Sequence, residues 1–561
     1  MLRRLLLATL VATAIHGVRF DDRVVWMPQA KLYVQDAATP SEDALSQAIA
    51  ACDLTCIKDK VTRTIAFVHR QMSTFPAPGL ALSVVYANRT VLAQGFGLAE
   101  HGNRKAVVTP HTLFEVGSFS KTFVAVAIAV LVDEGKLTWT DSVQQHLPWF
   151  EFADAYATQF TTLADLAAMN SVLGDYEGDD VIATGVYLTE KNLVHALRHL
   201  NTTRQVRPGY AYSNLNYEIL GQVIEAVTNQ PWHEYMRRAI WTPLGMTNTV
   251  GRAQDSRSSI SGGHFHCNGQ VLGPFDVTNS SRVMLRPGDH YAAAGSILST
   301  AADLSKFSEF LMRKGGSLMK SPAVIADLIT GHSVVPLPVE FATISGYEFV
   351  PDGDAVTAGY GFDVVGDIMH GHQYVDKGGD TFSFHTRTGW LPAHGVGVIL
   401  VANAQSFTGR PRDMATIDLM RTYILGVFLD IPPAQLDRQF QASLAQVDKL
   451  FRPSACDPYF YQGIPWDIPG VTIPNATKAA LVGTYHAVQS PAYYGAVVVS
   501  LNGTTLWMEY GVYKRRLIAT LDSATLVWAV DMGDTTTTVT IADVDTARPR
   551  ITYGVDFIRD L

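Results

Sequence analysis

The sequence predicts a mixed α/β (α+β) main domain, in which helices flank an antiparallel sheet beside an all-helical subdomain, followed by a small antiparallel β domain of barrel type. Three features predict this arrangement: β-rich runs at both ends of the main region, a helical stretch between them, and closely spaced short β runs near the C-terminus. At 561 residues the chain exceeds the ~100–200 residues of a typical domain, so more than one folded unit is expected.

The main domain should begin with a hairpin and a buried helix. The stretch GLALSVVYANRTVLAQGFGLAE, from Gly79, contains two β-rich runs around residues 87–89. After Ser118, the stretch KTFVAVAIAVLVDEGKL is apolar nearly all round and is closed by Gly135. A helix without a polar face belongs in the core, so we expect this one to be buried.

Helical and β-rich patterns follow in blocks. Residues 160–315 show successive amphipathic helices, and β-rich runs return in HQYVDKGGDTFSFHTRTGWL and HGVGVILVAN. Both ends of this region should therefore contribute to one sheet, with a last helix near ATIDLMRTYILGVFLD. Several prolines and no clear period in residues 431–475 predict a linker that wraps the main domain. The short runs from GTYHAV to TTTTVTIADV predict an antiparallel barrel or sandwich.

The N-terminal residues have the pattern of a secretory signal peptide. Arg3 and Arg4 precede an apolar stretch from Leu5 to Val11, and small residues follow. A short membrane anchor is the alternative, but this stretch falls below the ~20 residues that span a bilayer. We therefore expect a secreted, extracellular protein without a stable membrane span after cleavage. Five N-x-S/T sequons, compatible with glycosylation, stand at Asn88, Asn201, Asn279, Asn475 and Asn502.

These patterns predict a division of the chain into successive segments. The segments are a signal peptide at residues 1–17, an N-terminal extension at 18–74, the main domain at 75–430, a linker at 431–477 and the C-terminal β domain at 478–561. We see no tandem repeat and no long low-complexity tract.

The four cysteines fit two disulfides in an oxidising compartment, because their number is even and no pair has C-x-x-C metal spacing. Cys52 with Cys56 is our predicted first pair, which would leave Cys267 with Cys456 and staple the linker to the main domain. Four cysteines allow three pairings, and a free buried cysteine also remains open at each position.

Charge and composition disfavour some classes of partner. The chain carries 43 basic and 52 acidic residues, a net charge of -9, with no Lys/Arg block, so nucleic acid and anionic membranes are not expected partners. His264, His266 and Cys267 in GGHFHC, and His370 with His372, are the metal-ligand candidates. They lack a matching distal pair, so a glycine-rich surface loop is the preferred interpretation, and we expect no metal and no cofactor.

A serine and a lysine three residues apart, Ser118 and Lys121, stand just ahead of the apolar helix. Positions i and i+3 of a helix share a face, so both side chains should point to one spot above its N-terminus. A serine hydroxyl needs a base to become nucleophilic, and lysine can be that base only where burial or nearby positive charge lowers its pKa. A second S-x-x-K, Ser317 to Lys320, follows a glycine-capped helix and is explained as a turn.

Three motifs occur in a fixed order: TPHTLFEVGSFSKTF, then VRPGYAYSNLNYEILGQVIEAVT, then VDKGGDTFSF. Across roughly residues 75–425 the chain thereby resembles the serine β-lactamases and penicillin-binding proteins. The resemblance is greatest to the branch of class C β-lactamases, D-alanyl-D-alanine carboxypeptidases and esterases, peptidase family S12. Residues 478–561 are similar, less specifically, to the lipocalin-like domain of some S12 relatives. The resemblance implies a β-lactamase/transpeptidase-like fold.

The resemblance also implies roles for individual residues. Ser118 would be the acylated nucleophile and Lys121 its proton acceptor. Tyr212 and Asn214 match the family's Y-x-N motif. Tyr212 would shuttle protons between serine, leaving group and water, and Asn214 would hydrogen-bond Lys121 and the substrate.

The third motif is Lys377-Gly378-Gly379, where relatives carry K-T-G or H-x-G. On an edge strand, Lys377 would lower the pKa of Lys121 and Tyr212 and could attract a substrate carboxylate. The backbone N–H groups of Ser118 and Asp380, the latter next to Gly379, would form the oxyanion hole.

Each of these residues also has a structural interpretation: Tyr212 as a core aromatic, Asn214 as a helix cap and Lys377 as part of a surface turn. The predicted function is a secreted serine hydrolase with a covalent acyl-serine intermediate, acting on a small-molecule or peptide substrate. The alternative from another class is a non-catalytic binding or scaffold protein that keeps the fold. Whether the carbonyl belongs to a D-peptide, an ester or a β-lactam stays open, as does the oligomeric state.

Overall fold

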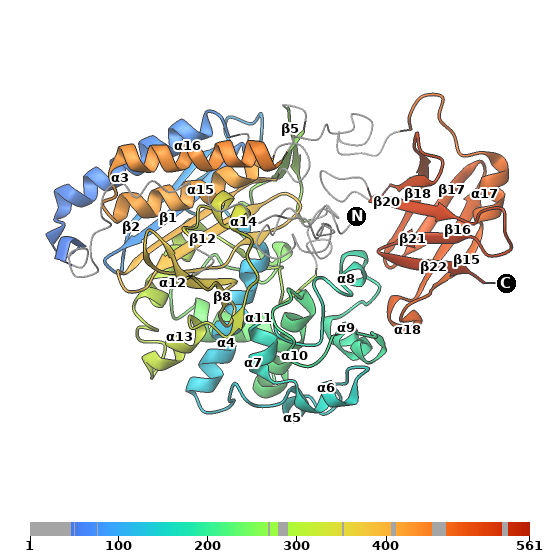
Figure 1. Cartoon of the computed structure of the whole chain (residues 1–561), viewed down its shortest axis with the longest axis horizontal. Coiled ribbons are helices and arrows are strands. Elements are labelled where there is room, and N and C mark those ends of the chain that lie inside the picture. The colour runs from blue at the N-terminus through green and yellow to red at the C-terminus, as the bar shows by residue number, and fades with distance from the viewer. Residues whose placement is uncertain are drawn as a thin grey trace.

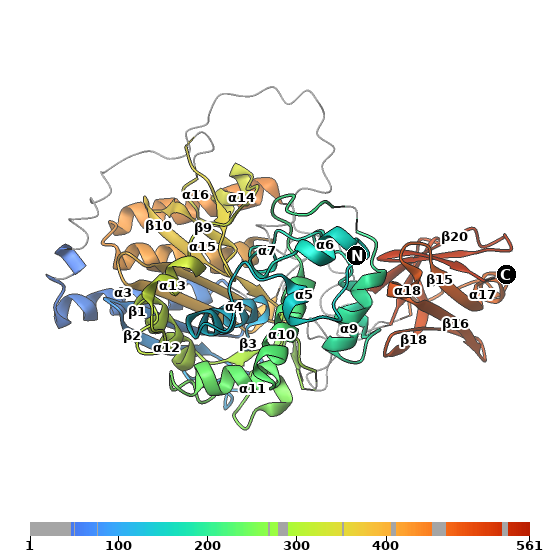
Figure 2. The same cartoon turned by 90° about the horizontal axis from the view of Figure 1, so that it is seen from below.

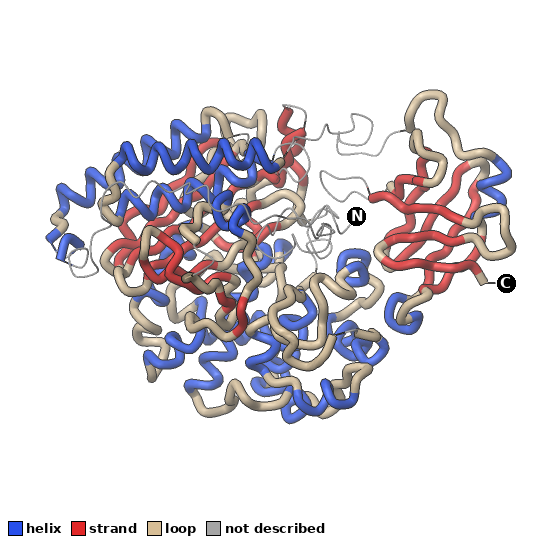
Figure 3. The backbone as a smooth tube through the Cα atoms, viewed as in Figure 1, coloured by secondary structure: helices blue, strands red, loops and turns tan. Residues whose placement is uncertain are grey.

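The computed structural model of the chain divides into a large body and a β-barrel at one end (Figure 1). It describes residues 47–49, 51–75, 77–202, 204–267, 270–278, 290–349, 353–405, 411–451, 467–529 and 537–560. Strands gather in two separate regions, the sheet of the large body and the barrel (Figure 3). This arrangement confirms the predicted fold class of an antiparallel sheet with helices plus a C-terminal barrel.

One antiparallel sheet organises the large body, with the strand order β2-β1-β13-β12-β10-β9-β8-β7 and β11 paired to β12. Its first two strands form the predicted hairpin, and β1 pairs on its other side with β13, from the far end of the domain. The strands are β1 (Gly79–Tyr86), β2 (Arg89–Gly97), β7 (Ser333–Val334), β8 (Thr357–Ala358), β9 (Val364–Met369), β10 (His372–Asp376), β11 (Gly379–Asp380), β12 (His385–Leu391) and β13 (Val396–Ala402).

The two faces of this sheet bury different helices. In β1, Ala81 and Val85 face the core that contains α4 (Ser120–Asp133), while Leu80, Leu82 and Val84 face the opposite core. This alternation follows from the two-residue period of a strand. The opposite face is covered by α3 (Leu54–Met72), α15 (Pro411–Phe428) and α16 (Pro433–Leu450), as Figure 1 shows.

Two of these covering helices were not predicted. Residues 433–450 form α16 within the segment expected to be a linker without a clear period, and α3 lies in the predicted N-terminal extension. A proline at the first position of a helix is favourable because no N–H is lost there, and Pro433 begins α16 in this way. Phe67 of α3 stacks on Tyr423 of α15 with ring centroids 3.7 Å apart, so segments from both ends of the large body complete this core.

A helical subdomain lies below the sheet in Figure 1 and adjoins α4. Its longest helix, α10, begins at Asn214 and packs on α4. The remaining helices of the large body are α5 (Val143–His146), α6 (Ala155–Phe160), α7 (Leu163–Ala167), α8 (Asp180–Thr184), α9 (Glu190–Ala196), α10 (Asn214–Thr228), α11 (Trp232–Met236), α12 (Ala301–Met312), α13 (Pro322–Leu328) and α14 (Val339–Ile344). Short strands outside the main sheet are β3 (Phe114–Glu115), β4 (Gly263–Cys267), β5 (Gln270–Phe275), β6 (Leu298–Ser299) and β14 (Ala404–Gln405).

The C-terminal domain is a closed antiparallel barrel in which β15 to β22 pair in sequence order and β22 returns to β15. The last two strands were not among the predicted β runs, yet they close the barrel. Its elements are β15 (Gly483–Ala487), β16 (Ala496–Asn502), β17 (Thr505–Tyr510), β18 (Tyr513–Ala519), β19 (Thr525–Trp528), β20 (Thr537–Ala542), β21 (Arg550–Tyr553), β22 (Val555–Arg559), α17 (Asn475–Leu481) and α18 (Pro491–Tyr494). Within the described ranges, no helix has the length and apolarity that crossing a membrane requires.

Candidate active site

Ser118 lies in a short 3-10 turn, Gly117–Phe119, that leads directly into α4. Gly117 adopts a φ of +53°, the left-handed region that favours glycine, and this bend presents the next residue at the helix start. The helical spacing then brings Lys121 Nζ to 3.1 Å from Ser118 Oγ. The structure thus brings the predicted serine and lysine together in a buried position, with Ser118 3% exposed.

Lys121 has two further fixed partners besides the serine. Its Nζ donates to Asn214 Oδ1 at 2.7 Å and to the carbonyl oxygen of Ala294 at 2.8 Å. Complete burial and the nearby positive charge of Lys377 hold the pKa of Lys121 well below its ordinary value. The carboxylates of Asp363, Asp179 and Glu218 act in the opposite direction but do not outweigh burial.

Tyr212 stands between the two lysines. Lys377 Nζ lies 3.3 Å from the Tyr212 hydroxyl, and the Nζ atoms of Lys121 and Lys377 lie 5.1 and 4.8 Å from its ring centroid. Ser118 is near enough to act on the Tyr212 hydroxyl, and it opposes the rise of its pKa. We expected Lys377 to lower the pKa of Tyr212, and this was wrong: burial and the charge of Asp363 raise it well above its ordinary value. The phenol is therefore neutral at physiological pH.

Lys377 follows β10 and precedes β11, so it lies where the chain passes from one strand to the next. We expected Lys377 on an edge strand, but it lies on neither of them: β10, which has neighbours on both sides, ends at Asp376, and β11, which pairs with β12, begins at Gly379. The Lys377 ammonium forms an ion pair with Asp363, whose side chain is 15% exposed. We expected Lys377 to be available to a substrate carboxylate. In the structure its charge is instead neutralised by the carboxylate of Asp363.

Two glycines, Gly117 and Gly379, allow β11 to pack closely against the turn that carries Ser118. A Cβ on Gly379 would lie 2.0 Å from the Val116 carbonyl oxygen and 3.1 Å from the Ser118 amide nitrogen. A Cβ on Gly117 would lie 2.8 Å from the Asp380 amide nitrogen. Side chains at either position would separate these segments, so the glycines allow the amides of Ser118 and Asp380 to lie close to one reacting atom, as an oxyanion hole requires.

The carboxylate of Asp380 is anchored behind the strand. It accepts hydrogen bonds from Arg387 at 3.1 Å and from Gln405 at 2.8 Å, and lies 2.7 Å from His385 Nδ1. Burial acts to raise the pKa of Asp380, but the positive charge of Arg387 and the nearby His385 outweigh it and hold this pKa below its ordinary value. Only the backbone of Asp380 is thus left to face the serine turn.

The segment at Ala294 is fixed by two buried carboxyl groups that the sequence analysis did not single out. Glu218 accepts from the Ala294 amide at 3.1 Å, and Glu190 accepts from the Ala293 amide at 2.8 Å. Burial and the neighbouring Glu190 raise the pKa of Glu218 well above its ordinary value. Both carboxyls line a cavity of about 350 Å³ together with Tyr291 and residues of α8 and α9. This pair therefore fixes the carbonyl that holds Lys121.

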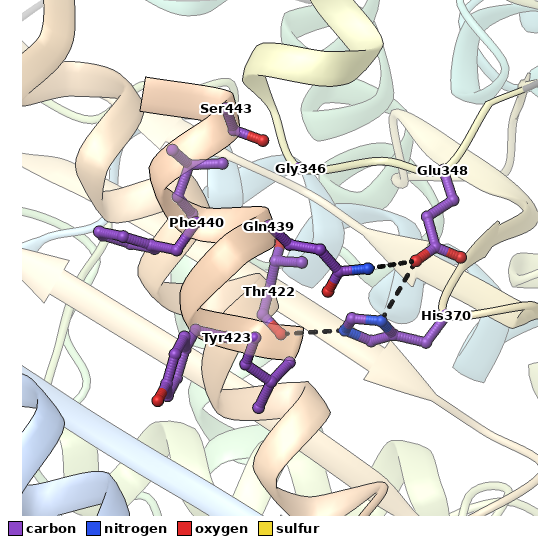
Figure 4. A pocket seen from close by; sticks show the side chains of 10 residues that line it. Gly346, Glu348, His370, Thr422, Tyr423, Gln439, Phe440 and Ser443 are labelled. Carbon is purple, nitrogen blue, oxygen red and sulfur yellow. Dashed lines mark hydrogen bonds and ion pairs between the residues drawn. The ribbon is translucent and has the colours of Figure 1, made fainter. Parts of the chain in front are cut away.

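The histidines considered as metal ligands do not converge. His264 lies between the Asn403 carbonyl and the His101 amide, and His372 contacts His394. His370 instead lies between Glu348 and the Thr422 carbonyl, beside a cavity of about 20 Å³ (Figure 4). Among the described residues, no group of three or more His, Cys, Asp or Glu side chains is arranged to hold a metal ion.

The structure places the other predicted sites on the surface or beyond its described part. Cys52 and Cys56 form the predicted disulfide, whereas Cys267 belongs to β4 with an undescribed side chain and Cys456 lies outside the described residues. Asn279 is also outside that range. The exposed sequon asparagines are Asn88, Asn201, Asn475 and Asn502. In the second S-x-x-K, Lys320 is exposed at the surface, and its amide and ammonium contact Asp133.

Comparison with known proteins adds the family. Residues 68–420 match the beta-lactamase family. Unguisins hydrolase ungD' of Aspergillus campestris is 24% identical over 419 residues, 70% of this chain and 71% of that protein. Protein flp of Staphylococcus aureus is 30% identical over 189 residues, 32% of this chain and 36% of flp.

A solved structure extends the similarity to most of the chain. The octameric penicillin-binding protein homologue from Pyrococcus abyssi superposes with a TM-score of 0.54 at 19% identity, covering 89% of this chain and 100% of that one. At this identity the match establishes a common fold. The family match covers residues 68–420, which include Ser118, Lys121 and both later motifs. The chain therefore belongs to the beta-lactamase family.

Proposed function

We propose that the protein is a secreted serine hydrolase of the S12 type, with Ser118 as nucleophile, Lys121 as base and Tyr212 as proton relay. The observation that carries this proposal is the contact of 3.1 Å between Lys121 Nζ and Ser118 Oγ, inside a site that favours a neutral amine. Similarity to a protein named a hydrolase, over 71% of that protein's length, supports hydrolysis as the reaction class.

The partners of Lys121 support its role as the base. A neutral amine has two N–H groups and one lone pair, and Asn214 Oδ1 and the Ala294 carbonyl accept the two N–H groups. The lone pair is then directed at the Ser118 hydroxyl. Ser118 Oγ attacks the substrate carbonyl carbon as its proton passes to Lys121, and the amides of Ser118 and Asp380 stabilise the oxyanion.

Tyr212 supports the second half of the reaction. The tetrahedral intermediate collapses to acyl-Ser118 when the leaving group departs with a proton, and the neutral Tyr212 hydroxyl can deliver that proton while taking one from Lys121 or Lys377. Water then attacks the acyl carbonyl, gives up a proton to the same network, and Ser118 leaves with its hydrogen restored. Asn214 holds Lys121 throughout.

A fluorophosphonate probe is expected to add one mass increment to the protein collected from culture medium, with the adduct on Ser118. Ser118→Ala should carry none, while Ser317→Ala, in the second S-x-x-K, should label like the parent. Intact mass and peptide mapping are the measurements. A folded parent protein without an adduct would support the non-catalytic scaffold in place of the hydrolase.

The ion pair of Lys377 with Asp363 favours substrates whose acyl part is neutral, such as esters or amides without a nearby carboxylate. We expect Asp363→Asn to release this charge and to raise kcat/KM for a succinyl monoester relative to the acetyl ester of the same alcohol by about tenfold, equal to ~1.4 kcal/mol. The two esters share a leaving group, so the ratio reports acyl charge alone.

Asp367→Asn provides the matched control, because Asp367 is an exposed carboxylate on β9, the strand that begins directly after Asp363. It should leave the ratio of the two rates unchanged. If Asp363→Asn and the parent protein have the same ratio of kcat/KM for the succinyl and acetyl esters, Lys377 does not recognise the charge of the acyl group.

Secretion is part of the proposal and has its own support. The Cys52–Cys56 disulfide suits an oxidising compartment, and the sequon asparagines within the described ranges are exposed. The intact mass of protein from the medium tests this as well, since loss of the N-terminal apolar stretch and any glycan mass appear in the same spectrum.

A further inference from the structure

Asp179 connects the catalytic lysine to the barrel. Its carboxylate accepts a hydrogen bond of 2.5 Å from Asn214 Nδ2, while the other end of the same amide accepts from Lys121. An amide held at both ends cannot rotate, so Asp179 fixes which atom of Asn214 faces the lysine. Asp179 is the residue immediately before α8.

The barrel grips the segment that carries Asp179. Gly511, in the turn between β17 and β18, packs so closely that a Cβ there would lie 2.1 Å from the Thr184 carbonyl at the end of α8. The Val512 amide donates to the same carbonyl at 2.9 Å. Figure 1 shows α8 at the border between the large body and the barrel.

A second set of barrel contacts holds the start of the segment. Tyr493 of α18 donates from its hydroxyl to the Gly178 carbonyl at 3.1 Å, next to Asp179, and accepts through its own carbonyl from the Tyr187 hydroxyl at 2.7 Å. Gly554, between β21 and β22, lies against Asp180, since a Cβ there would be 1.9 Å from its carboxylate. Both ends of α8 are therefore held by the barrel, through close packing of its glycines and through hydrogen bonds.

We propose that the barrel is a positioning element of the active site: by clamping α8 it holds Asp179 against Asn214, and thereby sets the position of Lys121. This inference rests on the proposed function, in which Lys121 is the base. Asp179 is a positioning residue and not a catalytic one, because it acts on the reacting atoms through Asn214. The barrel is thus required for full activity without touching the reacting atoms.

Two glycines of the barrel give a matched test. Gly511 and Gly503 both lie in hairpin turns with a φ of +60°, but nothing lies within 4 Å of a Cβ on Gly503. We expect Gly511→Ala to push α8 away and to slow probe labelling of Ser118 by about tenfold to a hundredfold, the scale on which misplaced catalytic groups lose rate. Gly503→Ala carries the same backbone strain and should label at the parental rate.

The titration of Lys121, followed by ¹³Cε NMR and assigned with Lys121→Arg, is the second readout. The titratable groups that face Lys121 are Lys377, Asp363, Asp179 and Glu218, and the negative charge of Asp179 raises the pKa of this lysine. Gly511→Ala and Asp179→Asn should therefore both shift the pKa of Lys121 downward, and Gly503→Ala should not. The double variant of Gly511 and Asp179 should shift it no further than Asp179→Asn alone, because both changes act through one contact.

The outcomes separate the two proposals. A parent protein that never labels, but whose Lys121 titration moves in Gly511→Ala, would overturn the hydrolase and keep the coupling. Labelling and titration that are alike in Gly511→Ala and Gly503→Ala would overturn the coupling and keep the hydrolase. Should Gly511→Ala fail to fold, Tyr493→Phe removes only the bond to Gly178 and should give the same direction of change in both readouts.

Discussion

Replacing Lys121 with methionine is expected to reduce kcat/KM for acyl transfer by about 10²–10⁴-fold, the usual contribution of a positioned general base. Methionine keeps the length of the buried chain but offers no lone pair to Ser118 Oγ. In the parent protein the rate should rise with pH as Lys121 loses its proton. It should level off well below the pH at which an exposed lysine titrates, because burial and Lys377 lower this pKa.

The control is Lys320→Met, which alters the exposed lysine of the second S-x-x-K and should leave kcat/KM and its pH profile unchanged. Steady-state rates from acid to alkaline pH on one neutral ester are the measurement. A Lys121→Met protein that retains parental kcat/KM would show that another group deprotonates the serine.

Arg421→Met is expected to lower the free energy of unfolding by about 3–5 kcal/mol, as breaking a buried ion pair does. Arg421 is 1% exposed, contacts Asp376 at 3.0 Å and donates to the Ser345 carbonyl at 2.7 Å. Its loss would leave Asp376 charged and buried, with hydrogen bonds from the hydroxyls of Tyr347 and Tyr374.

The stability loss should also depend on pH in a definite direction. Burial raises the pKa of Asp376, and removing Arg421 would raise it further. A carboxyl with a raised folded-state pKa favours the folded protein at low pH and loses that benefit as pH rises, so the penalty of Arg421→Met should shrink on acidification. Urea unfolding at two pH values measures this, with Arg515→Met, on an exposed arginine, as the control. Equal losses from both substitutions would refute the prediction.

The local part of the site was predictable and the long-range part was not. Helix geometry alone places Lys121 beside Ser118, because three residues along a helix return to the same face. Tyr212, Asn214 and Lys377 were found through the order of their motifs, and the structure brings all three to the lysine and serine. Their meeting depends on contacts between segments far apart in the chain, which a local pattern does not encode.

The supporting carboxylates had no sequence signal. Asp363 and Asp179 stand outside the quoted motifs, yet one neutralises Lys377 and the other holds Asn214. The wrong prediction for the pKa of Tyr212 has a related origin, because the burial of this phenol and the nearby charge of Asp363, which together raise its pKa, are both set by tertiary structure. Whether a lysine is free or paired is a property of tertiary structure, so the substrate preference could not be deduced from Lys377 alone.

The sequence predicted those helices and strands whose apolar residues follow a clear pattern. The hairpin of β1 and β2, the apolar α4 and most barrel strands followed their patterns. Helix α16 was not predicted because neighbouring prolines, here at residues 432–433, usually indicate irregular chain, although a proline is also favourable at the first position of a helix. Strands β21 and β22 are short and joined by a single glycine, so neither gave a clear run of its own.

The pairing of β1 with β13 has a consequence for how the chain reaches its native state. Leu80 lies opposite Ala402, so the centre of the sheet joins residues made at very different times during synthesis. The pairing of β1 therefore cannot be completed until β13 has emerged from the ribosome. Such non-local pairing slows folding and exposes strands to aggregation, so this chain should depend on chaperones during its biogenesis more than a helical protein of equal length.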